Sequence, residues 1–216
     1  ERLVPELSTV HHPLYQLRRT PFHARTSQLC LPHNWRRWGG CLAVGSYDLG
    51  LEREYWAIRN HAALIDISPL IKYEITGRDA ARLLHRLTPR DIHRMQVGQA
   101  RGTIVAIGTG KLLDDGTVTR IGEQSFRLTA AEPQYRWLSM NAVGMQVQVT
   151  ELTEQMAALS LQGPKSRAIL NLACEQPVDA LKYFRMAFNR IAGKPVSVSR
   201  TGYTGDLGYE IWMDAA

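Results

Sequence analysis

A short stretch near the end of the chain gathers residue types that could hold a flat ligand. Residues 199–210 contain three glycines, two tyrosines and two carboxylates, among them Tyr203 and Glu210. Glycine permits positive φ angles and close backbone approach, so the loop could fold tightly and present both side chains to one ligand. One carboxylate can accept two adjacent N–H groups through strong, charge-assisted hydrogen bonds. The pattern therefore suits a heterocycle such as a pterin, which has a ring N–H beside an exocyclic amine.

The same stretch also has a purely structural interpretation. Residues 195–200 and 208–213 read as two strands joined by a glycine-rich turn, which is a β-hairpin pattern. Glycine-rich turns of this kind are common. Residue types alone therefore leave both interpretations open.

A pair of adjacent carboxylates, Asp114 and Asp115, is the second candidate for chemistry. The pair follows a predicted turn at 108–111 and precedes Gly116. In an extended chain, successive side chains point to opposite faces, so one carboxylate can be structural while the other faces a ligand. A carboxylate beside a substrate amine can hold a developing cation or shuttle its proton. The alternative is a solvated Asp-Asp-Gly turn.

The segment from Arg200 to Glu210, Arg-Thr-Gly-Tyr-Thr-Gly-Asp-Leu-Gly-Tyr-Glu, resembles the signature of the glycine cleavage T-protein (aminomethyltransferase) family. Members of this family are tetrahydrofolate-dependent one-carbon transferases. The resemblance runs from about residue 20 to the end of the chain. Further matching segments are Asp66-Ile-Ser, Leu87-Thr-Pro-Arg-Asp-Ile, Val97-Gly-Gln-Ala, Asp114-Asp115, Leu161-Gln-Gly-Pro-Lys and Tyr183-Phe184.

The resemblance implies tetrahydrofolate as the cofactor and assigns roles by position. Asp115 would be the catalytic residue, which stabilises the cationic nitrogen or takes its proton. Glu210 would fix the edge of the pterin, and Tyr203 and Tyr183 would pack on or beside it. Leu70 would line the pocket next to them.

Three departures from the family pattern concern the substrate end of that pocket. Where glycine-cleaving members carry His-Met, Tyr and Asn, this chain has Pro69-Leu70, Gly102 and Ala131. The resemblance therefore leaves the one-carbon donor open. The donor could be an aminomethyl group on a lipoyl carrier protein, or a sulfonium, methoxy or N-methyl compound, as in the demethylase branches. A non-catalytic folate-binding protein is a third alternative, although the Lys-Gly-Cys-x-x-Gly-Gln-Glu signature of such relatives is absent here.

The elements that must position these residues follow from hydrophobic periodicity. Helices are predicted at 52–64, 77–87, near 134–141 and from 164 to 172; in the second, Ala80, Leu83, Leu84 and Leu87 form one buried face. Strands are predicted at 72–76, 102–107, 117–121, 125–130, 146–150, 156–161, 187–191, 195–200 and 208–213. This interleaving predicts an α+β fold with mixed or antiparallel sheets and a ferredoxin-like unit over 72–161.

We expect two regions in the chain. Residues 1–50, with prolines at 5, 13, 21 and 32, read as an irregular N-terminal segment that packs on the main domain. Residues 51–216 read as the T-protein-like folate-binding region. The sequence ends just after a predicted strand, which suggests a piece of a longer protein without the C-terminal barrel domain of the family.

Composition narrows the functional classes. The 216 residues are 44% hydrophobic and 21% charged, which is ordinary for a soluble globular protein. No apolar run approaches the roughly 18–20 residues of a membrane span, so a cytoplasmic location without membrane contact is expected. The net charge of +6 favours anionic partners such as folate with its glutamate tail. The absence of a Lys/Arg run argues against nucleic acid, and the His and Cys spacings predict no metal site.

Overall fold

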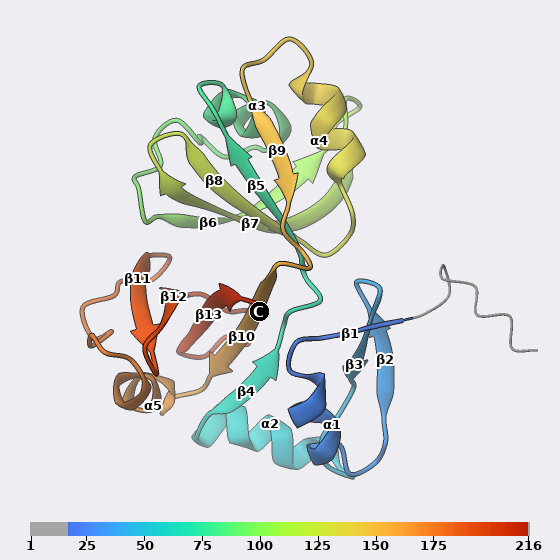
Figure 1. Cartoon of the computed structure of the whole chain (residues 1–216), viewed down its shortest axis with the longest axis vertical. Helices are drawn as coiled ribbons and strands as arrows, with labels where there is room; N and C mark the ends of the chain where they lie inside the picture. Colours follow the sequence, from blue (N-terminus) through green and yellow to red (C-terminus); the bar gives the residue numbers. More distant parts are fainter. Residues whose placement is uncertain (1–16, 216) are drawn as a thin grey trace, which may run out of the picture.

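The computed structural model describes residues 17–215 and arranges them as three groups of strands that meet at a common junction (Figure 1). The first group is a five-stranded antiparallel sheet in the order β6-β7-β8-β5-β9. Its strands are β5 (Ile71–Thr76), β6 (Ala100–Ala106), β7 (Leu112–Gly122), β8 (Ser125–Ala130) and β9 (Gln148–Glu151). We call it the upper sheet, after its place in Figure 1.

Two helices pack on one face of the upper sheet, α3 (Ala80–Leu87) and α4 (Tyr135–Ala142). The buried residues of α3 are Ala80, Leu83, Leu84 and Leu87, which confirms the predicted face. They pack with Tyr73, Ile75, Phe126 and Leu128 of the sheet. Because side chains alternate along a strand, Arg127 and Thr129 of β8 point away from this core, toward the junction.

The second group, the lower sheet, is also antiparallel, in the order β11-β12-β13-β10-β4. Its strands are β4 (Ala63–Asp66), β10 (Met156–Gln162), β11 (Met186–Ile191), β12 (Lys194–Ser199) and β13 (Gly208–Asp214). Leu170 of α5 (Ser166–Ala173) packs with Val198, Tyr209 and Ile211 in a second core. Glu210 and Trp212 alternate with these core residues and face the junction.

The third group corrects one expectation about residues 1–50. The described part of that segment is not irregular: it contains β1 (Arg18–Arg19), α1 (His23–Leu29), β2 (Trp35–Trp38) and β3 (Cys41–Val44). The three strands form a small sheet in the order β1-β3-β2. The sequence pattern missed these elements because they are short, and because β1 and α1 lie between prolines. Residues 1–16 lie outside the described part of the chain, and the predicted domain division stays a prediction.

One addition and one correction concern the predicted elements. The predicted ferredoxin-like order βαββαβ is formed by β5, α3, β7, β8, α4 and β9. The addition is β6, an extra strand that pairs with β7 at the edge of the sheet. The segment 88–99 returns the chain after α3, so that β6 runs opposite to β5. The helix predicted at 52–64 is α2 (Leu51–Asn60), and it ends early because β4 pairs with β10 from Ala63 onward.

The remaining predicted strands and helices are present, and the α+β class with antiparallel sheets is confirmed. Within residues 17–215, no helix combines the length and apolar character needed to cross a membrane.

Candidate functional site

A cavity of about 270 Å³ lies where the three groups of strands meet; we call it the junction cavity. Four of the five predicted site residues line it: Asp115, Glu210, Tyr203 and Leu70. They come from β7, β13, the loop between β12 and β13, and the linker between β4 and β5. The other lining residues are Trp38, Gly116, Thr117, Thr129, Ala130, Ala131 and Trp212.

Tyr183 is the predicted site residue that the structure places elsewhere. It lines a separate cavity of about 250 Å³ together with Arg200 and residues of the loop between β12 and β13. Its ring packs edge-on against Phe184, with 4.5 Å between the ring centroids, and its side chain is exposed. Both cavities border the same loop, but Tyr183 and Glu210 do not share one.

The adjacent carboxylates of β7 point in opposite directions, as an extended chain requires. Asp114 is buried: its Oδ2 accepts hydrogen bonds from the backbone N–H of Ala131 (3.1 Å), that of Glu132 (3.0 Å) and Gln134 Nε2 (2.7 Å). Asp115 is exposed and lines the junction cavity. The pair lies within strand β7 and not in a turn, so the structure corrects the alternative of a solvated turn.

Glu210 occupies a central strand of the lower sheet, between Ser160 of β10 and Ser199 of β12. Thr201 Oγ1 donates a 2.7 Å hydrogen bond to Glu210 Oε2. The other oxygen, Oε1, accepts none from the described residues and can receive a ligand N–H. Burial raises the pKa of the Glu210 carboxyl, while the Thr201 hydrogen bond and the charge of Arg127 oppose that rise.

The glycines of the signature segment make room for a buried side chain. A Cβ at Gly202 or Gly208 would overlap the amide of Gln162, which is fully buried. Gln162 Nε2 donates to Ser160 Oγ at 2.8 Å and to the Thr201 carbonyl at 3.2 Å. The segment is thus a hairpin, as the structural interpretation predicted, and its loop also borders the cavity, as the functional interpretation predicted.

Arg59 of α2 holds the same loop from outside. It forms an ion pair with Asp206, and its Nη1 donates a 2.8 Å hydrogen bond to the Thr204 carbonyl. The loop is therefore anchored at both sides, while the Tyr203 side chain remains 73% exposed and accessible to a ligand.

Sequence reasoning missed two aromatic walls of the cavity. Trp38 lies in β2, within the segment expected to be irregular, and Trp212 lies in a predicted strand without an assigned role. The alternation along β13 is a usable signal, because Trp212 stands two residues from Glu210 and so shares its face. Nothing local in the sequence connects Trp38 to this site.

The three departures from the family pattern fall at different places. Leu70 and Ala131 line the junction cavity, and Ala131 stands beside the loop that Asp114 holds. Gly102 of β6 is not among the lining residues. A Cβ at Gly102 would meet only the Phe184 ring, at 4.0 Å. Among residues 17–215, no group of three His, Cys, Asp or Glu side chains is placed to hold a metal ion.

Comparison with known proteins assigns this chain to a family. The family model described as the GCVT N-terminal domain matches residues 25–216. An aminomethyltransferase of Chloroherpeton thalassium is 30% identical over 171 residues, which are 77% of this chain and 47% of that protein. A trimethylamine-oxide aldolase of Ruegeria pomeroyi is 35% identical over 209 residues, 90% of this chain and 26% of that protein. The chain thus spans about half or less of the length of these relatives.

Solved structures show the same fold. The glycine cleavage system aminomethyltransferase T of Bartonella henselae superposes with a TM-score of 0.82 at 27% identity, over 93% of this chain and 54% of that one. A heterotetrameric sarcosine oxidase of Corynebacterium superposes with a TM-score of 0.60 at 17% identity, over 93% of this chain and 88% of that one. The second similarity is one of fold alone.

Proposed function

Because the chain belongs to the family of the GCVT N-terminal domain, we propose that it is the folate-binding part of a tetrahydrofolate-dependent one-carbon transferase of the glycine cleavage T-protein type. The observation that carries this proposal is the junction cavity. It unites Asp115 of the upper sheet with Glu210 of the lower sheet, although the two residues are far apart in the sequence.

The residues present fit a pterin. Glu210 offers a carboxylate oxygen without a hydrogen bond from the described residues, in a cavity that Trp38, Trp212 and Tyr203 also line. A carboxylate can accept both the ring N–H and the exocyclic N–H of a pterin edge. Aromatic rings supply apolar contact area for a flat heterocycle.

Tetrahydrofolate, when bound, supplies a nucleophilic nitrogen that accepts the one-carbon unit. Glu210 orients its heterocycle. Asp115, which is exposed at the cavity wall, stabilises positive charge on the reacting nitrogen or takes its proton. Fixing two reactants in this way can lower a barrier by about 7–11 kcal/mol, so orientation by the cavity walls is the main contribution of this chain.

Two donor classes fit the site. In the first, an aminomethyl group arrives on a lipoyl carrier protein. In the second, the chain takes part in demethylation of an N-methyl, sulfonium or methoxy compound. Small residues, Gly116, Ala130 and Ala131, line the cavity near Asp115, and the similarity to a trimethylamine-oxide aldolase over 90% of the chain supports the second class.

The test begins with binding. Calorimetry of the 216-residue chain with tetrahydrofolate should show saturable binding, and Glu210→Gln should weaken it on the order of ten- to a hundred-fold, because a hydrogen bond to a charged group contributes about 1.5–3 kcal/mol. Equal affinity of the two proteins would contradict the role of Glu210, and no binding would overturn the proposed function.

A panel of methylated and aminomethyl donors with tetrahydrofolate then separates the classes by the one-carbon product formed. Binding without any transfer would favour the non-catalytic alternative.

A further inference from the structure

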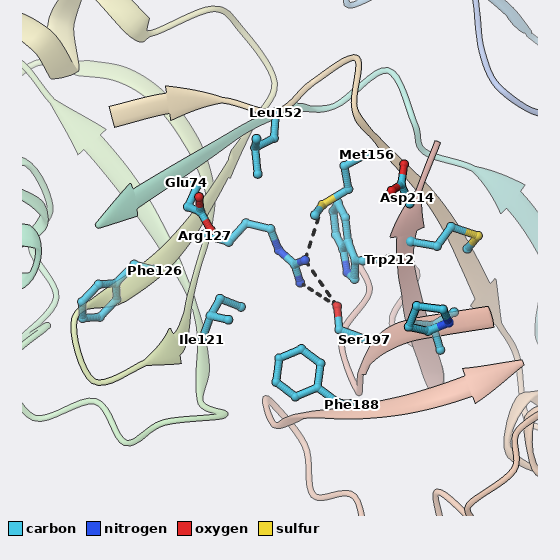
Figure 2. Close-up of a pocket in the computed structure, with 13 residues that line it drawn as sticks. Glu74, Ile121, Phe126, Arg127, Leu152, Met156, Phe188, Ser197, Trp212 and Asp214 are labelled. Atoms are coloured by element: carbon cyan, nitrogen blue, oxygen red, sulfur yellow. Dashed lines mark hydrogen bonds between the residues drawn. The ribbon is translucent and has the colours of Figure 1, made fainter. Parts of the chain in front are cut away.

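A third cavity, of about 230 Å³, lies between the upper and lower sheets; we call it the inter-sheet cavity (Figure 2). Its walls are largely apolar, with Ile121, Leu152, Met156, Phe188 and Val196 among the lining residues. Trp212 lines both this cavity and the junction cavity. The two cavities are therefore neighbours that share one aromatic wall.

The positively charged group in this cavity is the guanidinium of Arg127, which reaches from β8 toward the lower sheet (Figure 2). Arg127 is only 6% exposed. Its Nη1 and Nη2 share a single acceptor, the Ser197 hydroxyl, at 3.3 and 3.5 Å, and Nη1 also contacts Met156 Sδ at 3.5 Å. Its Nε is buried without a hydrogen-bond partner. The guanidinium carbon lies 4.5 Å from the centroid of the Trp212 ring.

This charge has no direct counter-ion in the described part of the chain. No carboxylate of residues 17–215 lies within 4.0 Å of the guanidinium. Glu74 stands opposite Arg127 in the sheet but forms no ion pair with it. Arginine stays protonated in proteins, and buried charges are normally paired. The charge of Glu210 also acts on Arg127, but the two side chains form no ion pair. A guanidinium without a direct ion pair at a cavity wall can therefore accept an anionic ligand.

We propose that the inter-sheet cavity binds a small organic carboxylate. The carboxylate would pair with Nε and one Nη of Arg127, because the planar guanidinium matches a carboxylate with two parallel hydrogen bonds. The apolar part of the ligand would rest against Phe188, Trp212 and Val196. This site stands apart from the proposed function and does not require folate.

The walls select the class of anion. Glu74 also lines the cavity, so a second negative charge on the ligand would be repelled. The apolar walls disfavour a strongly hydrated phosphate or sulfate, which has no apolar part to bury. A volume of about 230 Å³ is below the roughly 300–1,000 Å³ of sites for drug-sized ligands. The ligand is therefore a monocarboxylate of about the size of benzoate.

Benzoate and its neutral isostere benzamide are the probes. We expect benzoate to bind the 216-residue chain saturably in calorimetry, and benzamide to bind at least tenfold more weakly. Because Arg127 stacks on Trp212, benzoate should also change tryptophan fluorescence with the same midpoint. Equal binding of both probes, or no saturable binding of benzoate, would overturn the proposal.

Variants locate the site. Arg127→Met should remove the preference for benzoate, and Arg127→Lys should retain part of it, because lysine keeps the charge but loses the planar fork. The control is Arg53→Met, whose side chain is 85% exposed outside the cavity and which should bind benzoate like the unchanged chain. Unaltered benzoate binding by folded Arg127→Met would contradict the assignment. If Arg127→Met does not fold, the proposal is tested by the affinities of the unchanged chain for benzoate and benzamide alone.

Discussion

At the scale of single residues, Asp114 and Asp115 show how the pleat of a strand separates two identical side chains. Asp114 accepts hydrogen bonds from the 131–134 segment and holds that segment against β7. Asp115 faces the junction cavity and is exposed. The first carboxylate therefore contributes to stability, and the second is available for chemistry.

Substitution of each carboxylate by its amide should separate the two roles. Asp115→Asn should reduce one-carbon transfer by about 10²–10⁴-fold, the usual contribution of a positioned acid or base, and leave the urea midpoint unchanged. Asp114→Asn should lower the free energy of unfolding by about 1.5–3 kcal/mol, because an amide N–H₂ replaces a charged acceptor of buried donors. A stability loss in Asp115→Asn as large as that in Asp114→Asn would contradict this division.

Glu210 should make folate binding depend on pH. Burial raises the pKa of this carboxyl above its ordinary value of 4.5. As the pH falls through the raised pKa, the carboxylate gains a proton and can no longer accept both pterin N–H groups. Tetrahydrofolate affinity should therefore begin to fall at a higher pH than an ordinary glutamate would give.

The control for this prediction is Glu210→Gln, which cannot titrate. Calorimetry at several acidic pH values should show that the variant lacks the loss of tetrahydrofolate affinity that protonation of Glu210 causes. Titration of the ligand itself affects both proteins equally. If affinity depended on pH identically in the two proteins, Glu210 would not be the group whose protonation weakens binding.

At the scale of elements, the β12–β13 hairpin depends on the packing of its glycines against Gln162. Gly205 adopts a φ of +83°, which favours glycine, whereas Gly202 and Gly208 are needed because the Gln162 amide fills the space beside them. The same loop carries Tyr203 to the junction cavity. Its shape is therefore set by contact with β10 as well as by the turn.

Gly208→Ala should disturb this packing. The added methyl overlaps a buried amide, so we expect a loss of about 1–3 kcal/mol of stability, typical of overpacking, together with weaker tetrahydrofolate binding. Gly108→Ala is the matched control, because nothing lies within 4 Å of its new Cβ. Urea unfolding and calorimetry measure the two effects. Equal behaviour of both variants would show that the contact with Gln162 does not shape the loop.

At the scale of the whole molecule, Lys72 of β5 contacts both linkers that connect the upper and lower sheets. This lysine is fully buried, and its Nζ donates to the Ser68 carbonyl (2.5 Å) and the Thr153 carbonyl (3.4 Å). Ser68 follows β4 and Thr153 follows β9, in the two linkers that connect the upper and lower sheets (Figure 1). One ammonium group therefore joins both linkers. The relative placement of the cavity walls depends on these contacts.

Burial lowers the pKa of Lys72 from 10.5 to about 8. Between these two values the unfolded chain binds a proton that the folded chain has lost, so stability contributed by this group rises with pH. The rise should be about 1.4 kcal/mol per pH unit between pH 8 and 10.5. Lys72→Met should lack this increment, which urea unfolding at several pH values would measure. Parallel pH profiles of the two proteins would contradict the shifted pKa.

The order of the amino acids is enough to predict the local elements and the family. The i, i+3, i+4, i+7 spacing of α3 and the alternation of β8 and β13 are local patterns, and burial of one face follows from them. The signature from Arg200 to Glu210 and the pair at Asp114 are likewise contiguous, so no spatial information is needed to assign the family. The family match over residues 25–216 and the antiparallel sheets confirm these predictions.

Which side chains share a cavity depends on tertiary packing. The junction cavity forms where three groups of strands meet, and its walls depend on contacts between residues distant in sequence. For this reason Trp38 lines the junction cavity, although no role was predicted for it, whereas Tyr183 lines a separate cavity. Because side chains alternate along a strand, Asp114 and Asp115 must face opposite ways. Only the packing of the 131–134 segment decides which of them is buried. The same holds for Arg127, whose charge is buried because the upper and lower sheets lie on either side of the inter-sheet cavity.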